Sequence, residues 1–328
     1  MLKFNHNLQV FDQAFNNTQT DDGVVPMVEA RAYWDNQTVE IQLHGVQETD
    51  PDWSQNRLRW ELNGVGGVER IAPVKTGKSD ASMGTIRIPM ARVQSAQLLP
   101  LKLTLIDQKN SEITHKLADL LVLPSQAAQA RYSGKVTVQT WAGSEGAIVR
   151  QLNYDVDTRL SKNTELLVTN CPDAKALKWV WDGGRMLFIS EDDQSVFWSR
   201  GRGNLADGNW IKSVSWLRPD VHPHLKIDNP LNLPLRRVMP TGSIMGLNSE
   251  EVVNTDDYLA GQVSGWVQRP VIHTVQFRYG KGRVVMTTYA LLESMRLGDV
   301  DPVGVVMFND LIDYLGSERC QPKLSLDC

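Results

Sequence analysis

The sequence has few cysteines, no long apolar run and little net charge, and each of these absences excludes a class of protein. Its 328 residues include three cysteines, Cys171, Cys320 and Cys328, too few for a disulfide framework and wrongly spaced for a zinc site. No apolar stretch reaches the roughly 20 residues that a membrane-spanning helix needs. A net charge of −4 and a pI near 5.9 give no electrostatic reason to expect nucleic acid or a membrane as partner.

The N-terminal segment also lacks the apolar core of an export signal. Residues 1–25 are polar and show neither helical nor strand periodicity, so we expect a tail or linker there and not a signal peptide. Residues 319–328 are likewise expected to be a C-terminal tail. The polar N-terminus and the few cysteines together favour a reducing, cytoplasmic location.

Residues 26–124 have the short, alternating pattern of an all-β domain. Turn residues such as Asn63-Gly64 and Gly66-Gly67 separate the expected strands. These strands are 28–34, 38–46, 58–63, 84–90, 101–107 and 115–123. Their number and spacing predict a β-sandwich of immunoglobulin-like size, followed by a short linker at 124–134.

Residues 132–318 change to strands that alternate with helices, which is typical of an α/β domain with a central sheet. The last helix is expected to have Asp301 as its N-cap and Pro302 as its first residue. Expected strands are 135–141, 153–158, 164–170 and 185–190, with a hairpin over 269–291 that turns at Gly280-Lys281-Gly282. Expected helices are 144–152, capped by Ser144, 172–182, starting at Pro172, and 301–317.

The order of these pieces resembles the C-terminal region of bacterial family 2 glycoside hydrolases, the β-galactosidase and β-glucuronidase group. The segments that carry the resemblance are DGGRMLFIS (182–190), LAGQVSGW (259–266), FRYGKGRVVMTTY (277–289) and DPVGVVMFNDLIDYL (301–315). In that family an immunoglobulin-like β-sandwich follows the catalytic barrel. A flavodoxin-like domain, related to class I glutamine amidotransferases, follows the sandwich. The resemblance therefore implies an all-β domain and an α/β domain of these two kinds.

The resemblance also implies an accessory module that does not itself catalyse a reaction. The catalytic Glu residues of that family lie on a (β/α)8 barrel of about 250 residues, and no stretch of this sequence supplies eight strand–helix units. We expect a module that supports a catalytic barrel or contacts carbohydrate, either as a fragment of a glycosidase or as a free-standing protein. No cofactor is expected. The implied partners are carbohydrate or a catalytic glycosidase module, and a homo-oligomer is compatible with this role.

Two strand ends of the α/β domain could carry a nucleophile. An amidotransferase-like domain needs a Cys on the turn after 185–190, but Ser190 and three acids stand there, and acids raise the pKa of a thiol. Ser190 also lacks the flanking glycines of a nucleophile elbow, and His273, in an expected strand, is read as structural. Cys171 lies one strand early, before Pro172, where a helix N-terminus can activate a thiol. A small hydrolase that uses Cys171 therefore stays open as an alternative.

Tryptophan is frequent, with ten residues against seven Tyr and seven Phe, and it supplies the candidates for ligand contact. Trp198, Trp210, Trp216 and Trp266 fall in or beside the irregular segment 191–266, where they could stack on sugar rings or dock on a partner. A free-standing carbohydrate-binding protein is thus the second alternative. The tryptophans of expected strands and helices are predicted to pack in the cores: Trp34, Trp60, Trp141, Trp179 and Trp181.

Two glycine-rich segments imitate phosphate-binding loops without their context. APVKTGKS (72–79) has Ala72 in place of the first glycine of a P-loop and precedes strand-forming residues. GRGNLADG (201–208) does not lie directly between a strand and a helix. We expect neither to bind phosphate.

Histidines and acids also form pairs, but without the spacing of a site. His222 and His224, near Asp220 and Asp228, have no third His or Cys beside them and lack helical i,i+4 spacing, so no metal site is expected. The acid pairs Glu250-Glu251 and Asp256-Asp257 stand in polar segments and are expected to be solvated.

Overall fold

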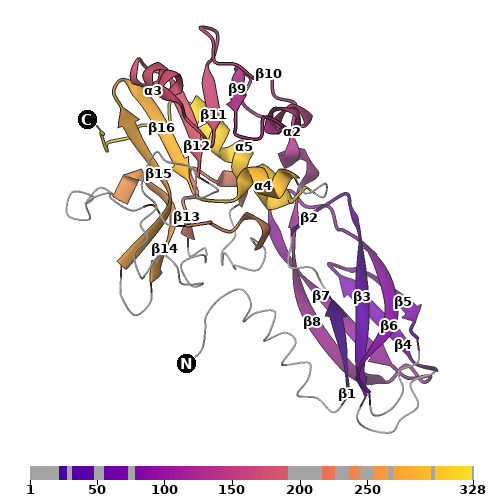
Figure 1. Ribbon diagram of the computed structural model, residues 1–328. Coiled ribbons are helices and arrows are strands. Elements are labelled where there is room, and N and C mark those ends of the chain that lie inside the picture. Colours follow the sequence, from indigo (N-terminus) through magenta and orange to yellow (C-terminus); the bar gives the residue numbers. More distant parts are fainter. Residues whose placement is uncertain are drawn as a thin grey trace. The chain divides into compact units, whose positions relative to one another are not determined.

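The chain folds into two compact units, one all-β and one of mixed helices and strands (Figure 1). The computed structural model describes residues 22–27, 32–47, 55–72, 78–190, 216–225, 236–242, 244, 255–264, 269–296 and 300–326. The boundary between the units falls between Ser125 and Gln126. The expected combination of all-β and α/β content is therefore present. No helix in the described ranges is long and apolar enough to cross a bilayer.

The all-β unit consists of two sheets that share one core. One sheet has three strands in the order β1-β3-β6, and the other has five in the order β2-β8-β7-β4-β5. All neighbours are antiparallel except β2 and β8. The strands are β1 (Asp22–Met27), β2 (Ala32–Trp34), β3 (Thr38–Gln47), β4 (Arg57–Leu62), β5 (Val65–Arg70), β6 (Lys78–Pro89), β7 (Gln97–Ile106) and β8 (Glu112–Leu123).

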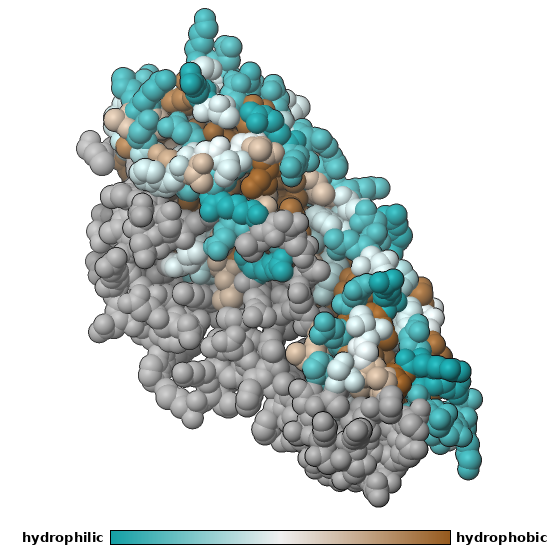
Figure 2. All heavy atoms as spheres, turned by 45° about the vertical axis from the view of Figure 1, so that its right-hand side comes forward, coloured by the Kyte–Doolittle hydropathy of each residue, from teal (hydrophilic) through white to brown (hydrophobic). Residues whose placement is uncertain are grey.

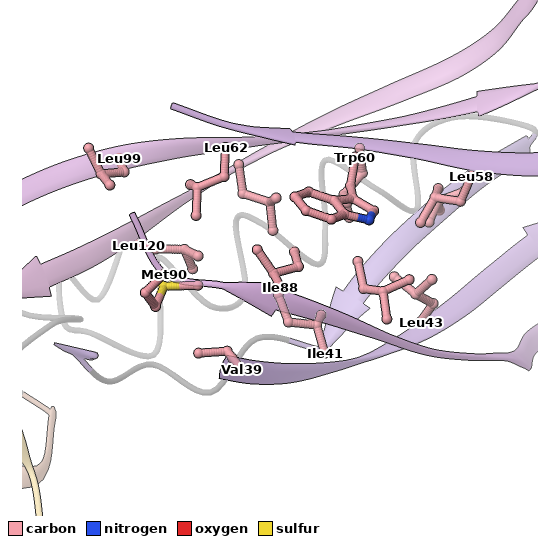
Figure 3. Close-up of a cluster of buried hydrophobic side chains, with 14 of the residues drawn as sticks. Val39, Ile41, Leu43, Leu58, Trp60, Leu62, Ile88, Met90, Leu99 and Leu120 are labelled. Carbon is pink, nitrogen blue, oxygen red and sulfur yellow. The ribbon is translucent and has the colours of Figure 1, made fainter. Parts of the chain in front are cut away.

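Alternating side chains build the core of this unit. On β4, Leu58, Trp60 and Leu62 are buried while the two residues between them are exposed, as the two-residue period of a strand requires. Ile41 and Ile88 of the other sheet belong to the same hydrophobic cluster (Figure 3). Burying a side chain of this size contributes roughly 1.5–3 kcal/mol, so the shared cluster holds the two sheets together.

A glycine makes room for the largest side chain of that cluster. Trp60 lies opposite Gly67 of β5, and a Cβ atom on Gly67 would come within 2.7 Å of the indole Nε1. The sequence predicts a turn at Gly66-Gly67, but both glycines lie within β5. The prediction is wrong because the glycines serve the packing of Trp60 and do not end a strand.

The mixed unit is built on one sheet of eight strands, in the order β10-β9-β11-β12-β16-β15-β14-β13. Neighbours from β10 to β16 are parallel, and the remaining strands join antiparallel. The strands are β9 (Val136–Gln139), β10 (Val156–Asp157), β11 (Leu166–Thr169), β12 (Arg185–Ile189), β13 (Trp216–Leu217), β14 (Tyr258–Ser264), β15 (Arg269–Tyr279) and β16 (Gly282–Thr287). The helices are α2 (Glu145–Gln151), α3 (Ala174–Trp181), α4 (Leu291–Arg296) and α5 (Pro302–Gly316), with short 3₁₀ helices η2 (Ser125–Ala128), η4 (Pro223–Leu225), η5 (Arg236–Val238) and η6 (Thr255–Asp257).

The strand order reverses beside β9. From β9 the chain passes through α2 to β10 on one side, and it then returns to β11 on the other side (Figure 1). At such a reversal the loops after the two central strands leave the carboxyl edge in opposite directions. Open α/β sheets bind ligands in the crevice that this creates. The loops after β9 and β11 therefore mark the place to look for a site.

Helix starts follow their capping residues. α5 begins as predicted, with Pro302 first and the Asp301 carboxylate accepting backbone N–H groups of the first turn. α3 begins later than predicted because Asp173, and not Pro172, supplies the cap, accepting from the N–H of Ala176. Ser144 precedes α2 as expected, but its side chain makes no capping hydrogen bond.

The segments expected to be a linker and a C-terminal tail both pack on the mixed unit. The Asn309 side chain of α5 donates to backbone carbonyls of residues 127–129. At the other end, the Asp257 carboxylate accepts the backbone N–H groups of Lys323 and Leu324. Side-chain hydrogen bonds to backbone, which no periodicity reveals, therefore extend this unit in both directions.

Candidate functional site

The candidate site lies at the carboxyl edge of the parallel strands, where the loops after β9 and β11 start side by side. The two strands are paired in parallel, with Gln139 opposite Thr169. The residues that follow must therefore emerge at the same edge of the sheet. Trp141 comes from the first loop, and Asn170 and Cys171 come from the second.

Trp141 is the most exposed large hydrophobic residue in the described part of the chain, at 62%. Its backbone is nevertheless fixed, because its N–H donates to the side-chain oxygen of Asn170 at 3.0 Å, and Asn170 is only 2% exposed. Gly143 follows with a φ of 69°, a left-handed conformation that glycine adopts without strain. A buried amide and a glycine thus define the path of this loop, and the indole lies in solvent.

The buried carboxylate of Glu145 holds the other end of the same loop. Glu145, the first residue of α2, is fully buried, and its carboxylate accepts a hydrogen bond from the Thr140 hydroxyl and pairs with Arg296 of α4. Burial by itself would raise the pKa of Glu145, but the hydrogen bond from Thr140 and the charge of Arg296 lower it below its ordinary value. Glu145 is therefore a structural anion and not a proton donor.

Cys171 is half-buried at this edge, among oxygen atoms. Its backbone N–H donates to the Thr169 hydroxyl at 3.0 Å, and its Sγ lies 3.9 Å from the Gln139 carbonyl oxygen. The Gln139 side chain in turn donates to the Asp173 carboxylate at 3.3 Å. The Thr169 hydroxyl, which donates to Sγ at 4.0 Å, and the Gln139 carbonyl are neutral groups, and neither supplies the positive charge that activates a thiol nucleophile.

Ser190 and His273 do not combine with Cys171 into a catalytic arrangement. Ser190 follows β12 and is fully buried. His273 is on β15, three places from β11 in the strand order, which corresponds to about 14 Å across the sheet. Its Nδ1 lies 3.2 Å from the carbonyl oxygen of Gly242. His273 is therefore out of reach of the thiol, and its hydrogen bond to Gly242 is to a backbone carbonyl.

His222 and His224 both lie close to the carboxylate of Asp310, a residue of α5. His224 Nδ1 is 2.7 Å from Asp310 Oδ1, while His222 Nδ1 is 4.0 Å from Oδ2. Arg131 pairs with the same carboxylate. Burial lowers the pKa of His222 to about 4, although the charge of Asp310 opposes this. A metal ion at this carboxylate would be repelled by the Arg131 guanidinium. The cluster instead links η4 and the segment around Arg131 to α5.

Two of the other acids singled out in the sequence pair with basic residues in the described part of the chain. Asp220 pairs with Arg218, and Asp256 pairs with Lys323. Asp228 and the pair Glu250-Glu251 lie outside the described residues. Within those residues, no group of three or more His, Cys, Asp or Glu side chains could hold a metal ion.

Of the four tryptophans predicted as contact residues, the structure describes one. Trp216 forms part of β13, pairs with Gly261 of β14 and packs, half-buried, against the hydrophobic core of the sheet. Trp198, Trp210 and Trp266 lie outside the described residues. Trp216 therefore packs on the core from β13, the edge strand of the sheet.

The prediction that the remaining tryptophans pack in the cores is correct for some of them and wrong for others. Trp60 is buried, and Trp34 and Trp179 are half-buried. Trp181, at 39%, and Trp141 are exposed. On the face drawn in Figure 2, hydrophobic residues are interspersed with hydrophilic ones among the described residues. Sequence reasoning missed Trp141 because it placed the residue in a strand. The small residues that follow it, Ala-Gly-Ser, were the signal that the strand had already ended.

Comparison with known proteins adds no assignment at this point. Neither a protein-family model nor a curated sequence matches the chain. The resemblance to family 2 glycoside hydrolases therefore stays a prediction, and function must be argued from the fold and the site.

Proposed function

We propose that the chain is a non-catalytic accessory module of the kind found at the C-terminal end of family 2 glycoside hydrolases, where it supports a catalytic barrel. The observation that carries the proposal is the succession of two particular strand arrangements along one chain. Each arrangement alone is common, and fold alone does not fix function. Their order is what the family resemblance requires.

The all-β unit supports an immunoglobulin-like assignment through its strand order. Its sheets β1-β3-β6 and β2-β8-β7-β4-β5 correspond to strands A-B-E and A′-G-F-C-C′ of that fold. The parallel pair of β2 and β8 fits an opening strand that divides between the two sheets. Trp60 is buried on β4, the C strand, where immunoglobulin domains carry a buried Trp.

The mixed unit supports a flavodoxin-like, amidotransferase-like assignment. Numbered in chain order, its parallel strands β10-β9-β11-β12-β16 follow the sequence 2-1-3-4-5 of doubly wound flavodoxin-like sheets. The antiparallel strands β15, β14 and β13 extend this sheet on one side. An amidotransferase-like domain has the same parallel core.

The candidate catalytic groups support a module without chemistry of its own. Ser190 is buried, Glu145 is held by Thr140 and Arg296, and His273 is about three strand spacings from Cys171. The described sheets also do not form the eightfold barrel on which family 2 enzymes place their two Glu residues. These observations favour a supporting role over nucleophilic hydrolysis or glycoside hydrolysis by this chain.

The test is an assay of the purified chain on aryl β-galactosides, aryl β-glucuronides and glutamine, with Cys171→Ala as the matched variant. We expect no turnover above the level of the variant. Glutaminase activity that Cys171→Ala abolishes would establish the alternative cysteine-dependent hydrolase. Glycosidase activity that survives repurification in both proteins would also refute the proposal.

The supporting role has its own measurement. The affinity-tagged chain, produced in the cells it comes from, is expected to co-purify hydrolytic activity on an aryl β-glycoside. Eluates with no more activity than an untagged control would count against a barrel as partner.

A further inference from the structure

We propose that the carboxyl edge between β9 and β11 is a carbohydrate-binding site, in which the indole of Trp141 is the platform for one sugar ring. This goes beyond the accessory role, because a module that only supports a barrel needs no ligand at this edge. Open α/β sheets bind ligands where their strand order reverses. In this sheet that place is beside β9, and Trp141 follows β9 directly.

The exposure of Trp141 needs an explanation because an indole normally buries a large apolar area. A Trp side chain buries about 150–250 Å² when packed, yet this one is 62% exposed. Its backbone is not loose, since the buried Asn170 side chain accepts its N–H at 3.0 Å. A Trp side chain has only two χ angles, so on a fixed backbone it loses little conformational entropy when it binds a ligand. The arrangement is therefore suited to stacking.

The surroundings of the indole favour a sugar over a phosphorylated ligand. Arg296 pairs with Glu145, the first residue after this loop, and its charge is thereby compensated. Asp173 adds a negative charge at the start of α3. Phosphate recognition relies on charge-assisted hydrogen bonds from cations. With Arg296 paired and a carboxylate at the start of α3, the described part of this edge favours an uncharged ligand.

The same surroundings favour a sugar over a protein partner. Ala142, Gly143 and Ser144, which follow Trp141, are small and exposed, so they extend no apolar surface around the indole. A docking hot spot is instead enclosed by further contacts that exclude water. A sugar ring has an apolar C–H face and hydroxyl groups at its rim. The indole offers a flat apolar surface to that C–H face. The Gln139 amide and the Asp173 carboxylate, which bond to each other at 3.3 Å at the same edge of the sheet, are polar groups for the hydroxyls.

The experiment follows the indole N–H signals of the ¹⁵N-labelled chain by NMR during titration with galactose, glucose, glucuronate and their β-linked disaccharides. Trp141→Ala identifies the Trp141 signal by its disappearance and tests its contribution to binding. Trp181→Ala is the matched control, because Trp181 is also exposed but lies at the opposite, amino edge of the sheet, beside the turn at Gly280.

We expect saturable shifts of the Trp141 signal with a neutral sugar, weaker shifts with glucuronate, and at least about tenfold weaker binding in Trp141→Ala. Trp141→Phe should retain part of the affinity and Trp181→Ala nearly all of it. Shifts confined to other indoles, or no shift with any sugar, would overturn the proposal. So would binding of a protein partner that Trp141→Ala abolishes while sugars have no effect. None of these results depends on whether the chain supports a barrel.

Discussion

At the scale of single residues, the buried imidazole of His222 lowers the stability of the fold at acidic pH. It is 1% exposed, and neither ring nitrogen has a hydrogen-bond partner within the described ranges. Its pKa is about 4 in the fold against 6.5 for an ordinary histidine. Between these values the unfolded chain binds more protons than the folded one, so the free energy of unfolding falls as the pH is lowered from about 6.5 to about 4.

The prediction is that His222→Leu flattens this pH dependence. The native protein should lose up to roughly 3 kcal/mol from this residue over the interval, at about 1.36 kcal/mol for each unit of pKa difference. The variant has no group to protonate there, and it leaves no hydrogen bond unmade. Urea unfolding of both proteins at a series of pH values measures the slopes. Equal slopes would show that His222 is already protonated or is not buried in solution.

The two described cysteines should differ in reactivity from a catalytic thiol. Burial raises the pKa of Cys320 to about 12, and the thiol of Cys171 donates to the Gln139 carbonyl oxygen at 3.9 Å. We expect Cys320 to resist iodoacetamide at neutral pH, and Cys171 to react no faster than a small free thiol. Peptide mass spectrometry over a time course measures both. Alkylation of Cys171 that is faster than the free thiol by about tenfold or more would indicate an activated nucleophile.

Gly67 should be intolerant of a side chain, although β5 is largely exposed. A Cβ atom would lie 2.7 Å from Nε1 of Trp60, so Gly67→Ala must displace the indole and should destabilise the all-β unit by about 1–3 kcal/mol. Val68→Ala is the matched control on the same strand. Val68 is 49% exposed, so its loss should change stability by less than about 0.5 kcal/mol. Chemical unfolding followed by Trp fluorescence compares the two; similar effects would refute the packing argument.

At the scale of elements, capping explains which helix boundaries are predictable. Asp301 accepts from the backbone N–H groups of Val303 and Gly304, and the sequence pattern Asp-Pro announces this start. At α3 the predicted start is two residues early, whereas at α2 the predicted position is right but the expected capping bond is absent. Ser144 stands in the right place without making the bond, and Pro172 lies outside the helix that Asp173 caps. Only side-chain geometry separates these cases.

The two caps predict a measurable contrast. Asp301→Ala removes a capping carboxylate from α5, a helix that is buried along most of its length, and should lower stability by about 1–2 kcal/mol. Ser144→Ala removes a side chain that makes no capping bond and should have little effect. Denaturant midpoints of both variants test this. A comparable loss in Ser144→Ala would mean that its hydroxyl does cap α2 in solution.

The hairpin at the end of the sheet is an element that the sequence predicts well. The strands β15 and β16 pair antiparallel around a turn at Gly280-Lys281, as expected, and Gly280 has a φ of 59°. In contrast, the sequence does not predict β5, because its two glycines indicate a turn. Glycine signals a turn where the backbone needs it. It gives a false signal where a neighbouring side chain needs the space.

At the scale of the whole molecule, the two units have separate hydrophobic clusters. The cluster around Trp60 lies wholly within the all-β unit, and the cluster around Phe188 and Phe277 lies wholly within the mixed unit. Units with their own cores can unfold as separate cooperative transitions. Which core a residue belongs to then decides which transition its substitution affects.

Calorimetry of the full chain tests this. Gly67→Ala should lower the midpoint of one transition and Asp301→Ala that of another, with a shift of a few degrees for each kcal/mol. A single transition that both substitutions move equally would show that the units unfold together.

The sequence by itself determined the succession of an all-β and an α/β domain, most strands, and the final helix with its cap. These depend on local periodicity and on residues next to one another in the chain. Only the tertiary structure decided that Trp141 is exposed, that His222 and His224 gather on Asp310 instead of Asp220, and that β5 is a strand. Each of these depends on side chains from distant segments that compete for the same space or the same hydrogen bonds. That is why the candidate site at β9 and β11 could be located only after the strand order was known.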